Sequence, residues 1–339
     1  MPPRPPSPNP PRFSPDPVPA LTAALVRRAA ILAEPQTNVC RLFHGAAEGV
    51  DGLVIERLGA VLIAQLHAGR LAVDAEQARD LCALAAERVG ATAVYRKVYP
   101  RDRSAPRAAL DQQHRDATPW WGQPASPEFA VYEAGLQFLV RPYDGYATGL
   151  FLDHRHARQR VRELAAGRRV LNVFAYTCGF TVAAALGGAP ATVSVDISKK
   201  SLEWGQRNLA ANGVALDTHR FICDDAFAYY RRATRQGQRF DFIILDPPTF
   251  ARQRTARGVF SLTDDLARLV AGALTLLDPD GLLHLSVNHR GTSLERLERV
   301  VAEAACSVGR TCAVAARPAL PDDFCGDPDY AKSVLFRIG

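Results

Sequence analysis

From residue 155 onward, segments with the apolar spacing of helices alternate strictly with short β-rich runs. The expected strands are 169–174, 192–196, 218–222, 241–246, 281–287, 311–316 and 332–337. The expected helices lie near 155–166, 179–187, 198–212, 225–235, 262–278 and 292–308. Helices of this length can connect parallel strands, and their alternation with strands is typical of an open, largely parallel sheet. We therefore predict an α/β fold with a Rossmann-like, seven-stranded domain over residues 143–339.

The preceding residues, 20–142, have a different pattern. They predict a helix at 20–33, two or three antiparallel strands between 41 and 69, a helix at 74–88 and a hairpin at 129–142 that turns near Ala134 and Gly135. A chain of 339 residues also exceeds what one hydrophobic core usually organises. We therefore expect a smaller N-terminal α/β domain over 20–142.

Composition excludes several classes of protein. The first nineteen residues are about half proline, which predicts a disordered tail over 1–19 and no signal peptide, and no apolar run is long enough to span a membrane. Seven scattered cysteines without a CxxC pair favour a reducing cytoplasm, and no histidine spacing predicts a metal site. A net charge of +6 is compatible with RNA binding but does not establish it.

In an open α/β sheet, ligands bind outside the carboxyl ends of the strands. The turn after the first expected strand of the large domain, residues 175–179, contains small residues and Gly179. It lacks GxGxxG, so by itself it is equally an ordinary strand-to-helix loop.

Acidic residues follow the next two expected strands. Asp196 can accept hydrogen bonds from the ribose hydroxyls of a nucleoside cofactor, or it can cap the helix that Ser198 opens. Asp225 can reach an adenine amino group, with Phe227 covering the ring, or it can simply cap the helix that begins at Ala226.

The sharpest signal is the sequence Asp246-Pro247-Pro248-Thr249-Phe250 after the fourth strand. Two prolines fix φ and end strand pairing, which predicts a stiff loop at the edge of the sheet. Such a loop can hold a flat nucleobase and stack it on Phe250.

Residues 148–250 closely resemble the class I S-adenosylmethionine-dependent domain of bacterial 23S ribosomal RNA methyltransferases, a family with cytosine-C5 and guanine-N7 branches. The resemblance rests on residues 148–155 (TGLFLDHR), 171–177 (LNVFAYT), 195–198 (VDIS), 202–213 (LEW, RNL and NG) and 246–250 (DPPTF). The guanine-N7 branch is the more similar one, in the first and fourth of these motifs and in residues 286–291 (SVNHRG). Cytosine-C5 members carry a nucleophilic cysteine after strand five, where this chain has Ser286, Val287 and Asn288.

The resemblance implies that Phe151 and Arg155 help to close over the cofactor. Arg155 could pair with the methionine carboxylate, although a surface salt bridge in an arginine-rich helix is the alternative. The full set of expected cofactor-binding residues is Phe151, Arg155, Asn172, Phe174, Ala175, Tyr176, Thr177, Gly179, Asp196, Ile197, Ser198, Asp225, Ala226 and Phe227. The expected catalytic residues are Asp246, Pro247, Pro248, Thr249, Phe250 and Asn288.

These features predict an S-adenosylmethionine-dependent RNA methyltransferase that forms 7-methylguanosine in 23S ribosomal RNA. Guanine N7 carries a free lone pair, so the enzyme need only align the reactants and exclude water. Three alternatives stay open: methylation of an exocyclic amino group, methylation of cytosine C5, and a catalytically silent RNA-binding assembly factor.

Overall fold

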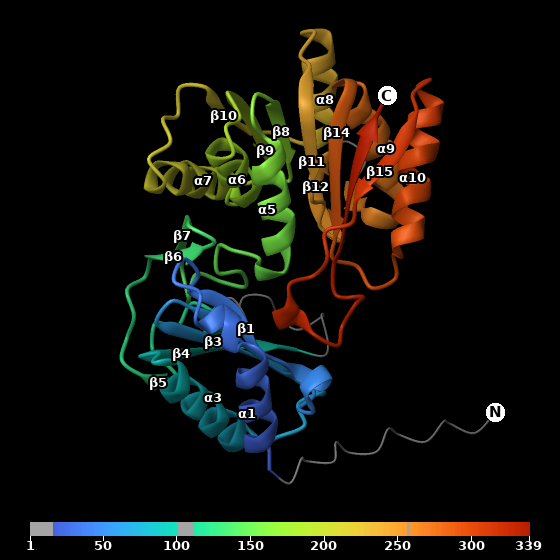
Figure 1. Ribbon diagram of the computed structural model, residues 1–339. Helices are drawn as coiled ribbons and strands as arrows, with labels where there is room; N and C mark the ends of the chain where they lie inside the picture. Colours follow the sequence, from blue (N-terminus) through green and yellow to red (C-terminus); the bar gives the residue numbers. More distant parts are fainter. Residues whose placement is uncertain (1–15, 101–111, 256–257) are drawn as a thin grey trace, which may run out of the picture. The chain divides into compact units, whose positions relative to one another are not determined.

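The computed structural model describes residues 16–100, 112–255 and 258–339, and between residues 250 and 260 it describes backbone only. The described chain forms two compact units. The N-terminal unit holds residues 16–131 and 140–148, and the C-terminal unit holds residues 132–139 and 149–339. Figure 1 shows the elements of both units. The sequence predicts a disordered tail over 1–19, and residues 1–15 of it lie outside the described part of the chain.

The N-terminal unit contains a five-stranded sheet in the order β1-β2-β3-β4-β5. Its strands are β1 (Val39–His44), β2 (Leu53–Leu58), β3 (Val61–His67), β4 (Ala93–Tyr99) and β5 (Trp121–Gly122). Strands β1 to β3 are antiparallel as predicted, whereas β4 runs parallel to β3 after the crossover helix α3 (Ala75–Val89). Asp74 and Gln77 form a capping box that starts α3, and Gly90 ends it with a left-handed backbone.

The helix predicted at 20–33 is two helices, α1 (Val18–Arg27) and α2 (Ala29–Leu32). The break falls at Arg28, which is only 2% exposed. Its guanidinium donates to the carboxylate of Glu48 at 2.6 and 3.1 Å and to the carbonyl of Arg41 at 2.5 Å. A buried charge needs such partners, so packing of this side chain overrides helix continuity.

A hairpin of β6 (Phe129–Glu133) and β7 (Leu136–Val140) lies at the division between the units. Its turn residues Ala134 and Gly135 both have positive φ, 50° and 77°, as the sequence pattern predicts for a tight hairpin.

The C-terminal unit is built on a seven-stranded sheet in the order β10-β9-β8-β11-β14-β16-β15, which confirms the predicted Rossmann-like α/β fold. Its strands are β8 (Arg169–Val173), β9 (Ala191–Asp196), β10 (His219–Cys223), β11 (Phe240–Leu245), β14 (Leu277–Val287), β15 (Cys312–Ala316) and β16 (Lys332–Ile338). Its helices are α5 (Arg155–Leu164), α6 (Gly179–Leu186), α7 (Lys199–Ala211), α8 (Ala226–Arg235), α9 (Leu262–Leu274) and α10 (Leu294–Ser307). All neighbouring strands from β10 to β14 are parallel, while β16 is antiparallel to both β14 and β15.

Most predicted boundaries in this unit agree with the structure to within about two residues, but one helix is shorter than expected. Helix α9 ends at Leu274 instead of residue 278. Leu277 already belongs to β14, where it pairs with Phe240 of β11. The strand then contains an irregularity before Leu282, where Asp280 has a φ of 59°. The sequence also did not predict the hairpin of β12 (Phe250–Thr255) and β13 (Gly258–Ser261).

The largest part of the core lies between the sheet and helices α8, α9 and α10. Buried side chains of β8, β11, β14 and β16 pack there against those three helices. Helix α6 packs against α5 and α7 as a second group (Figure 1). This packing supports the sheet on which the site is built.

Candidate functional site

The order of strands in the C-terminal unit reverses between β8 and β11. The chain moves outward from β8 to β9 and β10, and then returns past β8 to β11 and β14. Ligands of open α/β sheets bind at the carboxyl ends of the strands beside such a point. The residues that follow β8, β9, β10, β11 and β14 therefore form the candidate site.

The turn after β8 has an unusual backbone. Three non-glycine residues adopt positive φ: Phe174 (60°), Tyr176 (47°) and Cys178 (63°). Such residues cost of order 1–3 kcal/mol each and persist where the surroundings hold them, often at ligand sites. Here Tyr176 N donates to Asp196 at 2.8 Å, and the carbonyl of Thr177 accepts from Asn208 at 2.9 Å.

The motif at 202–213 supports this turn and the β6–β7 hairpin. The side-chain oxygens of Asn208 and Asn212 each accept a backbone N–H of β7 at 2.8 Å, and Trp204 Nε1 donates to the carbonyl of Leu139 at 2.9 Å. A Cβ on Gly205 would lie 2.3 Å from the sulfur of Cys178, so only glycine allows this approach. The motif is therefore structural.

Asp196 ends β9 with its carboxylate held by two backbone groups. Oδ2 accepts from Tyr176 N and Oδ1 from Ser198 N, both at 2.8 Å. Burial raises the pKa of this carboxyl, while hydrogen bonds from Ser198 and Tyr176 oppose that rise. Ser198, rather than Asp196, caps α7 by accepting from Ser201 N at 3.2 Å. Each Asp196 oxygen keeps acceptor capacity, which fits the ribose hydroxyls of a nucleoside.

Asp225 caps α8, since Oδ1 accepts from Ala228 N at 3.0 Å. Its other oxygen, Oδ2, is buried and has no hydrogen-bond partner among the described residues. The amino group of an adenine would satisfy that acceptor. Ile197, 51% exposed, presents an apolar side chain at the same edge of the sheet. Asp196, Ile197 and Asp225 therefore fit an adenosine group.

Phe227 lies near the start of α8, beside α9. Its ring packs against Tyr230 and lies under the guanidinium of Arg268, 4.0 Å from ring centroid to Cζ. Its contact with an adenine stays a prediction.

Phe151 and Tyr176 form an aromatic pair, with ring centroids 5.3 Å apart. Phe151 is 47% exposed although it is large and apolar. An exposed aromatic side chain beside the β8 turn fits its predicted contact with the cofactor.

Arg155 is not available for the predicted contact with the methionine carboxylate. Its Nη1 and Nη2 donate to the two carboxylate oxygens of Asp323 at 2.8 and 3.1 Å, and its Nε lies 3.7 Å from Glu133. Both partners are buried. The alternative of a surface salt bridge is also wrong, because the ion pair is internal.

Four other expected cofactor residues have buried side chains: Asn172, Ala175, Thr177 and Ala226. Asn172 Nδ2 donates to the hydroxyl of Thr181 at 2.9 Å, inside the layer between β8 and α6. Thr177 Oγ1 donates to the carbonyl of Gly149 at 2.6 Å. Buried side chains in these positions support the backbone of the site from the interior of the fold.

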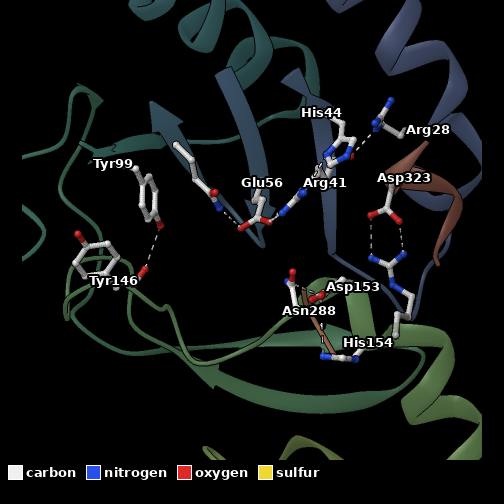
Figure 2. A network of polar contacts seen from close by, with 12 residues as sticks. Arg28, Arg41, His44, Glu56, Tyr99, Tyr146, Asp153, His154, Asn288 and Asp323 are labelled. Atoms are coloured by element: carbon white, nitrogen blue, oxygen red, sulfur yellow. Dashed lines mark hydrogen bonds and ion pairs between the residues drawn. The ribbon is translucent and has the colours of Figure 1, made fainter. Parts of the chain in front are cut away.

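Asp246 follows β11 directly, and three polar residues surround it. His154 Nε2 lies 3.4 Å from Oδ2 of Asp246 and 4.0 Å from Oδ2 of Asp153. Asn288 Nδ2 donates to the same Asp153 oxygen at 3.5 Å, as Figure 2 shows. Burial raises the pKa of Asp246, with His154 opposing and Asp153 adding to that rise.

The loop after Asp246 contacts the loop after β14. Thr249 Oγ1 donates to the carbonyl of Asn288 at 3.0 Å, while Pro247 is buried and Pro248 exposed. The structure thus brings Asp246, Thr249 and Asn288 together, as predicted residues of one site. The side chain of Phe250 lies outside the described residues.

The sequence analysis did not select Asp153 and His154 as site residues, although both belong to the TGLFLDHR motif. Beneath them, Phe180 lies between His154 and His284, with ring centroids 5.5 and 5.4 Å away. Burial lowers the pKa of His284 to about 3. Phe180 and the neutral His284 therefore form an internal layer beneath His154.

The described residues offer neither a metal-ion site nor a membrane-spanning helix. No group of three or more His, Cys, Asp or Glu residues there could hold a metal ion. In the same part of the chain, no helix is both long and apolar enough to cross a membrane.

Comparison with known proteins identifies the family. Residues 41–337 match the family model of S-adenosylmethionine-dependent methyltransferases. The chain is 34% identical over 294 residues to a ribosomal RNA large subunit methyltransferase of Deinococcus radiodurans, covering 86% of this chain and 70% of that protein. It is 41% identical over 173 residues to the ribosomal RNA large subunit methyltransferase K of Neisseria meningitidis. That match covers 51% of this chain and about half, 49%, of the relative.

A solved structure agrees with these relatives. The chain resembles a methyltransferase crystallised with SAH, with a TM-score of 0.81 and 27% identity over 94% of this chain and 80% of the other. The matched region includes the turn after β8, the Asp196 strand end and the Asp246 loop. The chain therefore belongs to the family of S-adenosylmethionine-dependent methyltransferases, within the class I group that includes the bacterial large-subunit ribosomal RNA enzymes.

Proposed function

We propose that this methyltransferase modifies large-subunit ribosomal RNA and that the product is 7-methylguanosine. The names of the Deinococcus and Neisseria relatives support the RNA substrate. The observation that carries the base assignment is the hydrogen bond from Thr249 Oγ1 to the backbone carbonyl of Asn288 at 3.0 Å, because it holds Asn288, and no cysteine, beside the Asp246 loop. A cytosine-C5 enzyme requires a nucleophilic cysteine in the loop that carries Asn288.

The cofactor supplies an activated methyl group on a sulfonium. In this proposal, Asp196 accepts the ribose hydroxyls, Asp225 accepts from the adenine amino group, and Phe151 covers the site beside Tyr176. The strained turn after β8 contributes backbone groups at Phe174, Ala175, Thr177 and Gly179. Hydrogen bonds to a charged acceptor contribute about 1.5–3 kcal/mol each, so Asp196 is the principal anchor.

The second set of residues holds the base. Pro247 and Pro248 make the loop rigid, and rigid placement is the main requirement when the nucleophile is a free lone pair. Asn288 is exposed and carries an N–H donor. A donor at this place suits O6 of guanine and leaves the lone pair of the neighbouring N7 free to accept the methyl group. Phe250 is proposed as the stacking platform.

A second candidate is methylation of an exocyclic amino group. One specific observation favours it: Asp246 and Asp153 are two carboxylates within 3.4 and 4.0 Å of the same imidazole nitrogen. Carboxylates accept hydrogen bonds from an amino group, and the raised pKa of Asp246 suits it to take up a proton that an amine must lose.

A third, non-catalytic candidate is an RNA-binding assembly factor that keeps the fold. It predicts RNA binding without methyl transfer. The proposal further assigns RNA positioning to the N-terminal domain predicted over 20–142, and it implies action in the cytoplasm, where ribosomal RNA is processed in bacteria.

Nucleoside mass spectrometry of ribosomal RNA from a deletion strain, its parent and a complemented strain tests the proposal. We expect 7-methylguanosine in large-subunit RNA to fall in the deletion strain and to return on complementation. Borohydride and aniline cleavage, which breaks RNA at 7-methylguanosine, then locates the nucleotide. Loss of an N-methylated amino group or of 5-methylcytidine instead would contradict the N7 assignment, and no change in any methylated nucleoside would favour the assembly factor.

A further inference from the structure

A pocket of about 720 Å³ lies in the C-terminal unit between α8, α9 and the C-terminal end of α10. This volume is within the range of about 300–1,000 Å³ that is typical of ligand pockets. Its apolar lining includes Phe227, Ala271 and Val308, and Val308 is 39% exposed. Neither Asp196 nor Asp246 lines it, so the pocket is separate from the cofactor and base sites described above.

The floor of the pocket depends on a glycine within a helix. Gly272 faces the ring of Tyr230, and a Cβ at that position would lie 2.6 Å from Cδ2 of the tyrosine. Glycine in a helix interior costs about 0.5–1 kcal/mol relative to alanine. The close approach of α8 and α9 explains why a glycine occupies this position, and it buries the ring of Tyr230 against α9.

The rim of the pocket is positively charged. Arg231, Arg235 and Arg268 line it, and none of the described residues that line it is acidic. Arg268 is paired with Asp265 at 2.8 Å. Arg231 and Arg235 are exposed and form no ion pair with an acidic side chain in the part of the chain that the structure describes.

Arg268 also covers an aromatic ring of the pocket with its planar guanidinium. Its guanidinium lies over the ring of Phe227 at 4.0 Å, which is a cation–π contact. Guanidinium planes and aromatic rings are the two surfaces on which proteins stack unpaired RNA bases. Arginines at the rim supply phosphate contacts at the same place.

We propose that this α8–α9 pocket is a second RNA-binding site, which takes one unpaired base onto its apolar floor and the flanking phosphates onto Arg231 and Arg235. The inference rests on the proposed function for its choice of RNA as the ligand. An acidic peptide would pair with the arginines but would place no planar group against the apolar lining. The pocket runs along α8 from Phe227, two residues after the Asp225 cap, to Arg235 at the C-terminal end of the helix.

The test measures RNA binding by the full chain with fluorescence anisotropy. The probe is a fluorescein-labelled oligoadenylate of about 12 nucleotides, a length within the usual site size of single-strand binding proteins. The double variant Arg231→Gln/Arg235→Gln should bind it several-fold more weakly. The slope of log affinity against log salt should fall by roughly 1.4, since each lost phosphate contact contributes about 0.7 for a single strand.

A second variant tests the apolar floor separately from charge. Thr234 lines the pocket and is exposed, so Thr234→Met fills part of the space without adding an aromatic ring and leaves all three arginines in place. It should weaken probe binding by roughly fivefold or more, the contribution of one stacked base, with an unchanged salt slope. The control is Arg296→Gln/Arg299→Gln on the exposed face of α10, which removes the same charge and should alter affinity by less than about twofold.

Methyl transfer to ribosomal RNA is measured in parallel to separate this inference from the proposed function. If the wild-type chain methylates ribosomal RNA while the α8 and α10 double variants bind the probe equally well, the pocket is not an RNA site. If the variants lose probe binding in the expected pattern but the wild-type chain transfers no methyl group to ribosomal RNA, the pocket is an RNA site and the proposed function is wrong.

Discussion

His154 Nε2 lies 3.4 Å from Oδ2 of Asp246, so a buried imidazole contacts the carboxylate that ends the central strand β11. The two residues come from different segments, one from the turn before α5 and the other from the loop that is proposed to hold the base. Burial raises the pKa of Asp246, and His154 counteracts that rise. His154 is therefore a positioning residue that favours the ionised form of Asp246.

Replacing His154 with alanine should make methyl transfer more sensitive to acid. Without the imidazole, the pKa of Asp246 rises further, so the ionised carboxylate and the activity that depends on it are lost at a higher pH than in the wild type. We also expect kcat to fall roughly tenfold to a hundredfold, the effect of a slightly misplaced reacting group. The measurement is the pH profile of kcat, with cofactor affinity from calorimetry as a check on folding.

His219→Ala is the control for that experiment, because His219 is also buried but contacts Thr192 at the opposite edge of the sheet. It should leave the acid limb of the profile unchanged. An unshifted acid limb in the His154 variant would mean that Asp246 is not held in its ionised state by the imidazole.

Asp196→Ala should weaken S-adenosylmethionine binding by about 1.5–3 kcal/mol. The variant removes the proposed ribose acceptor and also leaves the N–H groups of Tyr176 and Ser198 without their carboxylate. Calorimetric titration measures the loss. Asp241→Ala is the matched control, because Asp241 pairs with Arg169 at the start of β11 and β8, at the opposite edge of the sheet. Equal losses in the two variants would indicate general destabilisation rather than a ribose contact.

Arg155→Met should destabilise the fold by about 3–5 kcal/mol, because it removes the guanidinium that donates to both oxygens of the buried Asp323 carboxylate. The double variant Arg155→Met/Asp323→Leu should recover most of that stability, since two apolar side chains replace the pair. Denaturant unfolding measures both effects. Cofactor affinity of the folded double variant should match the wild type, and a large loss there would restore Arg155 to the cofactor site.

Local patterns predicted the parts of this site that lie close together in sequence. The alternation of helices and strands placed Asp196, Asp246 and Asn288 after strand ends, and all three are there. Contacts between distant segments have no such local signal. The pair of Arg155 and Asp323 joins residues separated by 168 positions, and nothing in the sequence near Arg155 distinguishes that partner from a cofactor carboxylate.

The contacts of Phe227 could not be predicted for a different physical reason. An aromatic residue just after an acidic cap can lie on either side of a helix, and its neighbour comes from another element. In this fold the ring contacts Arg268 of α9. The contact of His154 with Asp246 was not predicted either, because β11 brings Asp246 beside it from a distant part of the sequence.

Cys178→Ser should retain substantial methyltransferase activity. Cys178 lies in the cofactor turn, but its side chain is fully buried against Gly205, and burial raises the pKa of the thiol to about 12. A thiol that stays protonated at neutral pH cannot serve as the nucleophile that cytosine-C5 methylation requires. Single-turnover methyl transfer with labelled cofactor measures the activity, and alkylation by iodoacetamide in the folded chain should spare Cys178 while it modifies the exposed Cys223 and Cys306. Complete loss of transfer in a folded Cys178→Ser variant that still binds cofactor would contradict the thiol-independent chemistry on which the guanine-N7 proposal depends.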